Sequence, residues 1–147
     1  MQTQSDPNGC GPAALLAALQ AIGLHATQEA IGGLSGLTGR GTGTRGLQRA
    51  AKLLGATPSR WSLRDFGEAW CLLLGNLQVG RSAILSFDAD DHWVAAVGSL
   101  GSRVTIIDPA AVLRPMVNVL SREALEGPWR GERGTYYGIS FGKAEER

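Results

Sequence analysis

The first third of the chain has the pattern of a buried helix followed by a glycine-rich segment. Residues 13–22 are mostly alanine and leucine and end before Gly23, where a left-handed helix cap is favourable. Because apolar residues lie on nearly all sides of this helix, we expect it to be buried. Thr27 can cap a short helix over residues 28–31, and the glycines of residues 32–46 predict a mobile loop.

Two more helices are predicted before the middle of the chain. Apolar residues recur at positions i, i+3, i+4 and i+7, which indicates an amphipathic helix. These residues are Leu47, Ala50, Ala51 and Leu54. Ser62 and Asp65 then resemble a capping box at the start of a helix over Leu63–Leu74. Cys71 lies in the apolar part of that helix, and we interpret it as a thiol of the core.

The second half of the chain changes to short runs of β-type residues bounded by Gly, Asp and Pro. The predicted strands are Ser82–Phe87, Trp93–Ser99, Arg103–Asp108 and Tyr136–Phe141. Helices followed by an antiparallel sheet predict an α+β domain with an N-terminal helical lobe and a C-terminal sheet. A cleft between two such lobes is where a ligand site usually forms.

Length and composition indicate one soluble domain. The chain has 147 residues, 44% hydrophobic and 18% charged, so we expect residues 1–147 to form a single domain. Its net charge of +1 gives no electrostatic basis for binding nucleic acid, and no apolar run is long enough to insert into a membrane. Without a secretory signal pattern we expect a cytoplasmic protein whose two cysteines are free thiols.

The residues around Cys10 favour a nucleophilic thiol. Cys10 stands directly before the first predicted helix and lies between Gly9 and Gly11. The positive end of a helix dipole stabilises a thiolate, the form that attacks a carbonyl carbon, and glycine neighbours let a substrate backbone approach closely. The alternative is a small buried cysteine that happens to begin a helix.

A thiolate nucleophile needs a base, and the chain has two histidines. His25 lies in the loop after the first helix, a full helix length from Cys10, and we expect it to be a surface residue. His92 opens the strand Trp93–Ser99 and therefore stands at a strand end. A structural histidine is the alternative there, but His92 is the better candidate for the base.

The predicted β-hairpin supplies a partner for this histidine. The strands Trp93–Ser99 and Arg103–Asp108 are joined by a short turn, and counting back from it sets His92 opposite residues 108–110. Asp108 is at that end, and a carboxylate across the hairpin can hold an imidazole N–H and fix its tautomer. Asp108 followed by Pro109 also indicates a strand-ending turn.

Catalysis at a carbonyl also needs donors for the developing oxyanion. The backbone N–H of Cys10 is one donor by position, and a side-chain amide is the usual second. Gln4, six residues upstream, and Asn8, two residues upstream, are both candidates, whereas Gln2 is more distant.

These residues together resemble the bacteriocin-processing cysteine peptidases, papain-like enzymes that remove double-glycine leader peptides, often as the N-terminal domain of an export transporter. The resemblance covers nearly the whole chain. The matching segments are Gln4, Cys10 to Leu15, Gly43 to Gly55, Gly80 to Leu85, His92 and Trp93, Ile107 to Pro109, Trp129, and Gly134 to Gly138.

The resemblance implies a papain-like peptidase fold and assigns one role to each of four residues. Cys10 would be the nucleophile, His92 the base, Asp108 the residue that orients the base, and Gln4 the oxyanion-hole side chain. It implies a peptide or protein substrate cut after a Gly-Gly type sequence and an export transporter as a partner. We expect neither a cofactor nor a metal ion.

Two other functions use the same residues. A deamidase, amidase or transglutaminase-like effector would apply the same three catalytic groups to a different acyl group. A leader-peptide binding module would bind without turnover, although no catalytic position is substituted in this chain. We favour a peptidase over both.

Overall fold

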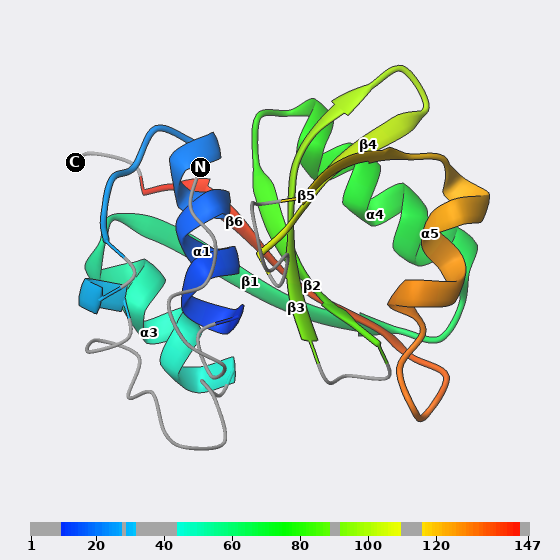
Figure 1. The fold of residues 1–147 in the computed structure, drawn as a ribbon, viewed down its shortest axis with the longest axis horizontal. Coiled ribbons are helices and arrows are strands. Elements are labelled where there is room, and N and C mark those ends of the chain that lie inside the picture. Colours follow the sequence, from blue (N-terminus) through cyan, green and yellow to red (C-terminus); the bar gives the residue numbers. More distant parts are fainter. Residues whose placement is uncertain (1–9, 28, 32–43, 89–91, 110–115, 145–147) are drawn as a thin grey trace.

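The chain folds around one antiparallel sheet with helices on both of its faces (Figure 1). A computed structural model describes residues 10–27, 29–31, 44–88, 92–109 and 116–144. Within these residues the sheet has six strands in the order β1-β6-β2-β3-β4-β5. The elements are α1 (Cys10–Ala21), α3 (Thr44–Leu53), β1 (Ala56–Leu63), α4 (Phe66–Gln78), β2 (Ser82–Phe87), β3 (His92–Leu100), β4 (Arg103–Asp108), β5 (Met116–Leu120), α5 (Arg122–Trp129) and β6 (Tyr136–Lys143). The predicted α+β class is confirmed.

Only the last part of the glycine-rich segment, residues 32–46, lies within the described residues. Residues 32–43, most of the stretch for which a loop was predicted, lie outside the described residues. The rest of that stretch belongs to α3, because this helix begins at Thr44.

Two hydrophobic cores lie on opposite faces of the sheet. On one face, α1 and α3 pack against the alternate residues Ile84, Ala95 and Ile139. On the other face, α4 and α5 pack against the intervening set, which includes Leu85 and Val94. Because both faces are covered, every residue of β2 is buried, as expected for a strand between two helical layers.

The N-terminal half contributes a strand that the sequence analysis did not predict. β1 pairs with β6 along its whole length, from Ala56 opposite Lys143 to Leu63 opposite Tyr136. The predicted start of the next helix at Leu63 is therefore wrong, because Leu63 still belongs to the sheet. Asp65 is the true N-cap of α4, and its carboxylate accepts a hydrogen bond from the N–H of Glu68 at 2.8 Å.

The prediction that Cys71 belongs to the core is also wrong. Cys71 is an exposed free thiol on α4, next to the buried Trp70. The apolar run in α4 is longer than the stripe that the sheet can cover, so Leu72 also remains partly exposed. Three of the tryptophans serve packing. Trp129 is fully buried, Trp70 is nearly so, and Trp61 stacks edge-on against Trp129 with ring centroids 5.6 Å apart.

The sequence between β4 and β6 contains two further elements. β5 extends the sheet by pairing with β4, and α5 follows directly after its N-cap Ser121, whose hydroxyl accepts from the N–H of Ala124. Within the residues that the structure describes, none of the helices has the length and apolar character that crossing a bilayer requires.

Candidate active site

The structure brings His92 and Asp108 into direct contact at one end of the sheet. His92 is the first residue of β3, and Asp108 is the last residue of β4. The Nε2 atom of His92 lies 2.6 Å from Oδ1 of Asp108. The histidine side chain is 11% exposed and the aspartate side chain 32%, so the pair lies at the border of the core and is reachable from solvent.

An irregularity in β3 places both side chains on the same face of the sheet. Next to the hairpin turn, Leu100 pairs with Arg103 and Ser99 with Val104, whereas beyond Val97 the register shifts, so that Ala96 pairs with Ile106 and Ala95 with Ile107. The shift is a β-bulge, in which two residues of one strand oppose one residue of the other.

The bulge decides which side Asp108 faces. Continuing the register beyond it sets Val94 opposite Asp108, so that His92, two residues from Val94, is the diagonal neighbour of Asp108 on one face. Without the extra residue Asp108 would oppose Ala95 and face the other side of the sheet. The predicted position of Asp108 at the His92 end is therefore correct, with a diagonal contact in place of a direct one.

Asp88, the last described residue before His92, is held by α5. Asp88, which follows β2, has a backbone φ of 53°, a left-handed value that non-glycine residues rarely adopt. Its N–H donates a hydrogen bond of 2.9 Å to the carbonyl oxygen of Pro128 in the last turn of α5. No helix was expected at α5, although Ser121 followed by Glu123 is a helix-start signal.

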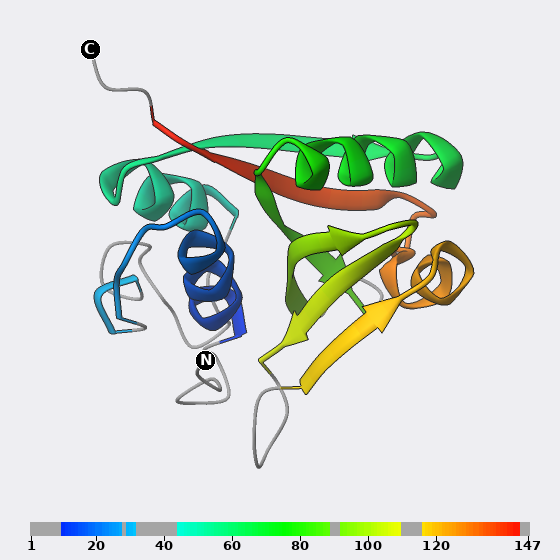
Figure 2. The same cartoon turned by 90° about the horizontal axis from the view of Figure 1, so that it is seen from above.

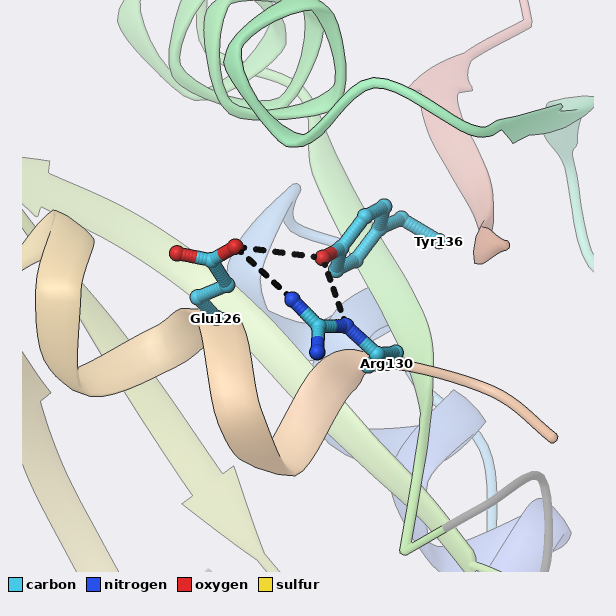
Figure 3. Close-up of polar contacts among 3 residues, drawn as sticks. All are labelled: Glu126, Arg130 and Tyr136. Carbon is cyan, nitrogen blue, oxygen red and sulfur yellow. Dashed lines mark hydrogen bonds and ion pairs between the residues drawn. The ribbon is translucent and has the colours of Figure 1, made fainter. Parts of the chain in front are cut away.

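A polar cluster fastens the end of α5 to β6 (Figure 3). The Nε of Arg130 donates to the Tyr136 hydroxyl at 3.1 Å, and Nη2 pairs with Glu126 at 3.0 Å. The hydrogen bond with Tyr136 raises the pKa of Arg130 above its ordinary value, so this residue remains a cation. Trp129 adds a hydrogen bond from its indole N–H to the carbonyl oxygen of Tyr137 at 3.0 Å.

Cys10 begins α1, and the direction of this helix carries it toward the His92 end of the sheet. α1 packs against β3 and β2, and the buried hydroxyl of Ser82 donates to the carbonyl oxygen of Ala18 at 2.6 Å. This contact joins the second half of α1 to the start of β2, whereas the other end of β2 pairs with His92 through Phe87. In Figure 1 the dark blue start of α1 lies toward the bottom of the view, as do the end of β2 and the start of β3.

The remaining predicted site residues lie elsewhere. The side chain of Cys10, and all of Gln2, Gln4 and Asn8, fall outside the part of the chain that the structure describes. His25 is exposed in the loop after α1, as expected, and takes no part in the His92 site. Trp93 points to the face opposite His92 and stacks on Tyr137, with ring centroids 5.9 Å apart.

The arrangement of His92 and Asp108 can support proton transfer. A carboxylate that accepts from Nε2–H fixes the neutral imidazole in the tautomer whose Nδ1 carries a lone pair. Nδ1 is then the ring atom suited to receive a proton from a thiol. Among the described residues no group of His, Cys, Asp or Glu side chains could hold a metal ion.

A papain-like peptidase domain has these features, with a helix that starts at a cysteine, packed against a sheet that carries a histidine and its carboxylate partner. The sequence model of the peptidase C39 family matches residues 1–133, so the chain belongs to the peptidase C39 family. It is a cysteine peptidase. A comparison with curated proteins gave no match.

Solved structures of peptidase domains share this fold. The peptidase domain of Streptococcus ComA, a bi-functional ABC transporter involved in quorum sensing, is 22% identical and covers 98% of this chain and 97% of its own, with a TM-score of 0.71. A double-glycine motif protease from an AMS/PCAT transporter, solved with its leader peptide, is 18% identical over 97% and 89%, with a TM-score of 0.68. A C39-like peptidase from Bacillus anthracis is 17% identical over 99% and 96%, also with 0.68.

Proposed function

We propose that this peptidase uses Cys10 as the nucleophile, His92 as the general base and acid, and Asp108 as the residue that orients His92. The observation that carries the proposal is the 2.6 Å contact between His92 Nε2 and Asp108 Oδ1. The position of Cys10 at the first residue of α1, a helix whose start is directed toward the His92 end of the sheet, supports it. A thiolate at a helix start is stabilised by the helix dipole.

The reaction is acyl transfer in two halves. The Cys10 thiol gives its proton to Nδ1 of His92, and the thiolate attacks the carbonyl carbon of the scissile peptide bond. The tetrahedral intermediate collapses when His92 protonates the leaving amine and the C–N bond breaks, which leaves a thioester on Cys10. His92 then takes a proton from water, the hydroxide attacks the thioester, and the carboxylic acid product leaves as the thiol is restored.

Donors for the oxyanion complete the proposed mechanism. We assign this role to the backbone N–H of Cys10 and the side-chain amide of Gln4, because acyl transfer needs hydrogen bonds where negative charge develops. Loss of one such donor typically lowers kcat by about a hundredfold to a thousandfold. Gln4→Ala should therefore lower kcat by that factor and change KM little, whereas Asn8→Ala should not.

We further propose that the substrate is a peptide with a double-glycine leader. The supporting observation is that structural relatives include a double-glycine motif protease in complex with a leader peptide and a peptidase domain of an ABC transporter. An export transporter is then the expected partner. A precursor is cut before it is exported, so we propose that the enzyme works in the cytoplasm, where its thiol also stays reduced.

The decisive experiment is mass spectrometry of synthetic peptides treated with the protein. The peptides carry Gly-Gly, Gly-Ala or Leu-Leu before the cut in an otherwise identical sequence. We expect Gly-Gly to be cleaved fastest, and Cys10→Ala to lower kcat by at least about a thousandfold. Cys71→Ala is the matched control, since this exposed thiol lies on the outer helix α4.

Three results would contradict parts of this proposal. Equal turnover of all three peptides would remove the double-glycine preference while leaving the peptidase intact. Full activity of Cys10→Ala would eliminate Cys10 as the nucleophile. A mass gain at a glutamine with no backbone cleavage would instead indicate a deamidase.

A further inference from the structure

A polar groove lies on the α4 face of the sheet, beyond the end of that helix. α4 follows directly after β1 and runs back along it, but its 13 residues extend about 20 Å, whereas the eight residues of β1 extend about 27 Å. The helix therefore stops before it reaches the start of β1, and Figure 2 shows it covering only part of β1 and β6. The uncovered part forms a groove of about 770 Å³.

The residues of β1 and β6 change character where the helix cover ends. Beneath α4, Trp61 opposes Gly138, and a Cβ on this glycine would lie 2.7 Å from the indole ring, so this row is tightly packed. The next rows on the same face are Ser59 opposite Ser140 and Thr57 opposite Gly142. Small and hydroxyl-bearing residues thus form the groove floor where a buried face would carry apolar side chains.

Two cations border this floor. Arg81, just after α4, lies across Gly142, where an added Cβ would be 3.5 Å from its Nε. Lys143 at the end of β6 lines the same groove. Neither cation forms an ion pair with any residue that the structure describes, and no described lining residue is acidic. The only described polar side-chain contact of Arg81 is a long one, 3.4 Å, to Oδ1 of Asn76.

The floor also offers a buried hydroxyl donor. Ser140 is 3% exposed, and its hydroxyl oxygen accepts a hydrogen bond of 2.9 Å from the indole N–H of Trp61. That bond leaves the hydroxyl proton as a donor, and no side-chain acceptor among the described residues takes it. Buried hydroxyl donors in proteins usually have a partner, and a bound anion at this place would supply one.

We propose that this groove binds an oxyanion of the phosphate class. The guanidinium, the ammonium and the hydroxyls of Thr57, Ser59 and Ser140 together present more donors than one carboxylate can accept, whereas a phosphate or diphosphate has enough oxygens for all of them. The groove volume also lies in the range of small-ligand sites. None of its lining residues belongs to the His92 site, so this inference is independent of the proposed function.

The test is a titration with pyrophosphate at low ionic strength, monitored by two-dimensional NMR. We expect saturable shifts of the amide signals of Gly80 and Gly142, and we expect Arg81→Ala with Lys143→Ala to weaken binding by about tenfold or more. The matched control removes two exposed cations outside the groove, Arg64→Ala with Arg103→Ala, and should bind as the parent does. Lys143→Ala alone, which removes an exposed side chain, should weaken binding to a smaller extent.

Further ligands separate the possible sources of the anion. ATP in place of pyrophosphate shows whether a nucleotide can supply the phosphates, and adenosine without phosphate should not bind. Glu145 and Glu146 follow the groove residue Ala144 and lie outside the described residues. The titration is therefore repeated with a variant that combines Glu145→Gln and Glu146→Gln. We expect this variant to bind pyrophosphate as the parent does.

Several outcomes would overturn the proposal. One is the absence of saturable shifts with pyrophosphate, and another is equal weakening in the control variant, which would indicate attraction by net charge alone. Saturation by a triglutamate peptide with none by pyrophosphate would replace the phosphate class with carboxylates. Loss of binding when Glu145→Gln and Glu146→Gln are combined would also contradict the assignment.

Discussion

At the scale of single residues, the contact between Asp108 and His92 depends on two side chains that are sixteen positions apart. Each was predictable because its position follows from local patterns. His92 opens a β-type run, and Asp108 with Pro109 ends one. The place of Cys10 at the start of α1 was predictable for the same reason, because Cys10 adjoins an alanine- and leucine-rich run. The side-chain donors of the oxyanion hole have no such pattern, and for that reason Gln4 and Asn8 both remained candidates.

Substitution of Asp108 tests its orienting role. Asp108→Ala removes the acceptor of Nε2–H, so we expect kcat/KM to fall by about a hundredfold to ten-thousandfold. Asp108→Asn keeps an oxygen acceptor and should lose less. The measurement is steady-state kinetics on the Gly-Gly peptide.

A second aspartate serves as the control for this experiment. Asp65→Ala removes the N-cap of α4 and should lower the free energy of unfolding by about 1 kcal/mol without changing kcat/KM. If Asp108→Ala were as active as the parent, Asp108 would not orient the base.

At the scale of elements, the helices and strands that have a regular apolar period were predictable from the sequence. The elements whose conformation depends on tertiary contacts were not. β1 contains Pro58 and Arg60, and four of its eight side chains are exposed. One face of this strand forms part of the groove floor, and the other face is only partly covered by α3. Its strand conformation comes from pairing with β6, a contact across about eighty residues that no local pattern reports. α5 is short and polar, so no local pattern marks it strongly either, and its position depends on Trp129 and Tyr136.

Substitution of Asp88 tests how the link to α5 affects the protein. Asp88 has a φ of 53°, which glycine adopts freely and β-branched residues adopt at a cost of about 1–2 kcal/mol. We therefore expect Asp88→Gly to keep the free energy of unfolding within about 1 kcal/mol of the parent, and Asp88→Val to lower it by about 1–2 kcal/mol.

Kinetics on the same pair separate positioning from stability. If the link from Asp88 to Pro128 positions His92, Asp88→Val should lower kcat by a larger factor than it raises KM under conditions where the protein is fully folded. An unchanged kcat in a folded Asp88→Val protein would show that the turn does not position the base.

At the scale of the whole molecule, the sheet separates two cores, and an aromatic cluster joins β1, β6 and α5. Trp61 lies over Gly138 and stacks on the fully buried Trp129. The sequence alone does not show which glycine lies beneath Trp61. That contact exists only when strands from opposite ends of the chain are paired.

Two glycine substitutions separate packing from helix propensity. Gly138→Ala would place a methyl group 2.7 Å from the Trp61 ring, and we expect a loss of about 1–3 kcal/mol in the free energy of unfolding. Gly75 lies inside α4 with no atom within 4 Å of an added Cβ, so Gly75→Ala should stabilise the protein by about 0.5–1 kcal/mol. Both are measured by urea unfolding, and a neutral Gly138→Ala would contradict this packing.

The extra residue at Val97 has a consequence for how this hairpin can change in length. Neighbouring side chains of a strand point to opposite sides, so the carboxylate of Asp108 meets the imidazole only when the residue count between them has the right parity. A single insertion or deletion in either strand would turn Asp108 away from His92, and a second one nearby would turn it back. Relatives that keep both side chains should therefore differ in this segment by even numbers of residues.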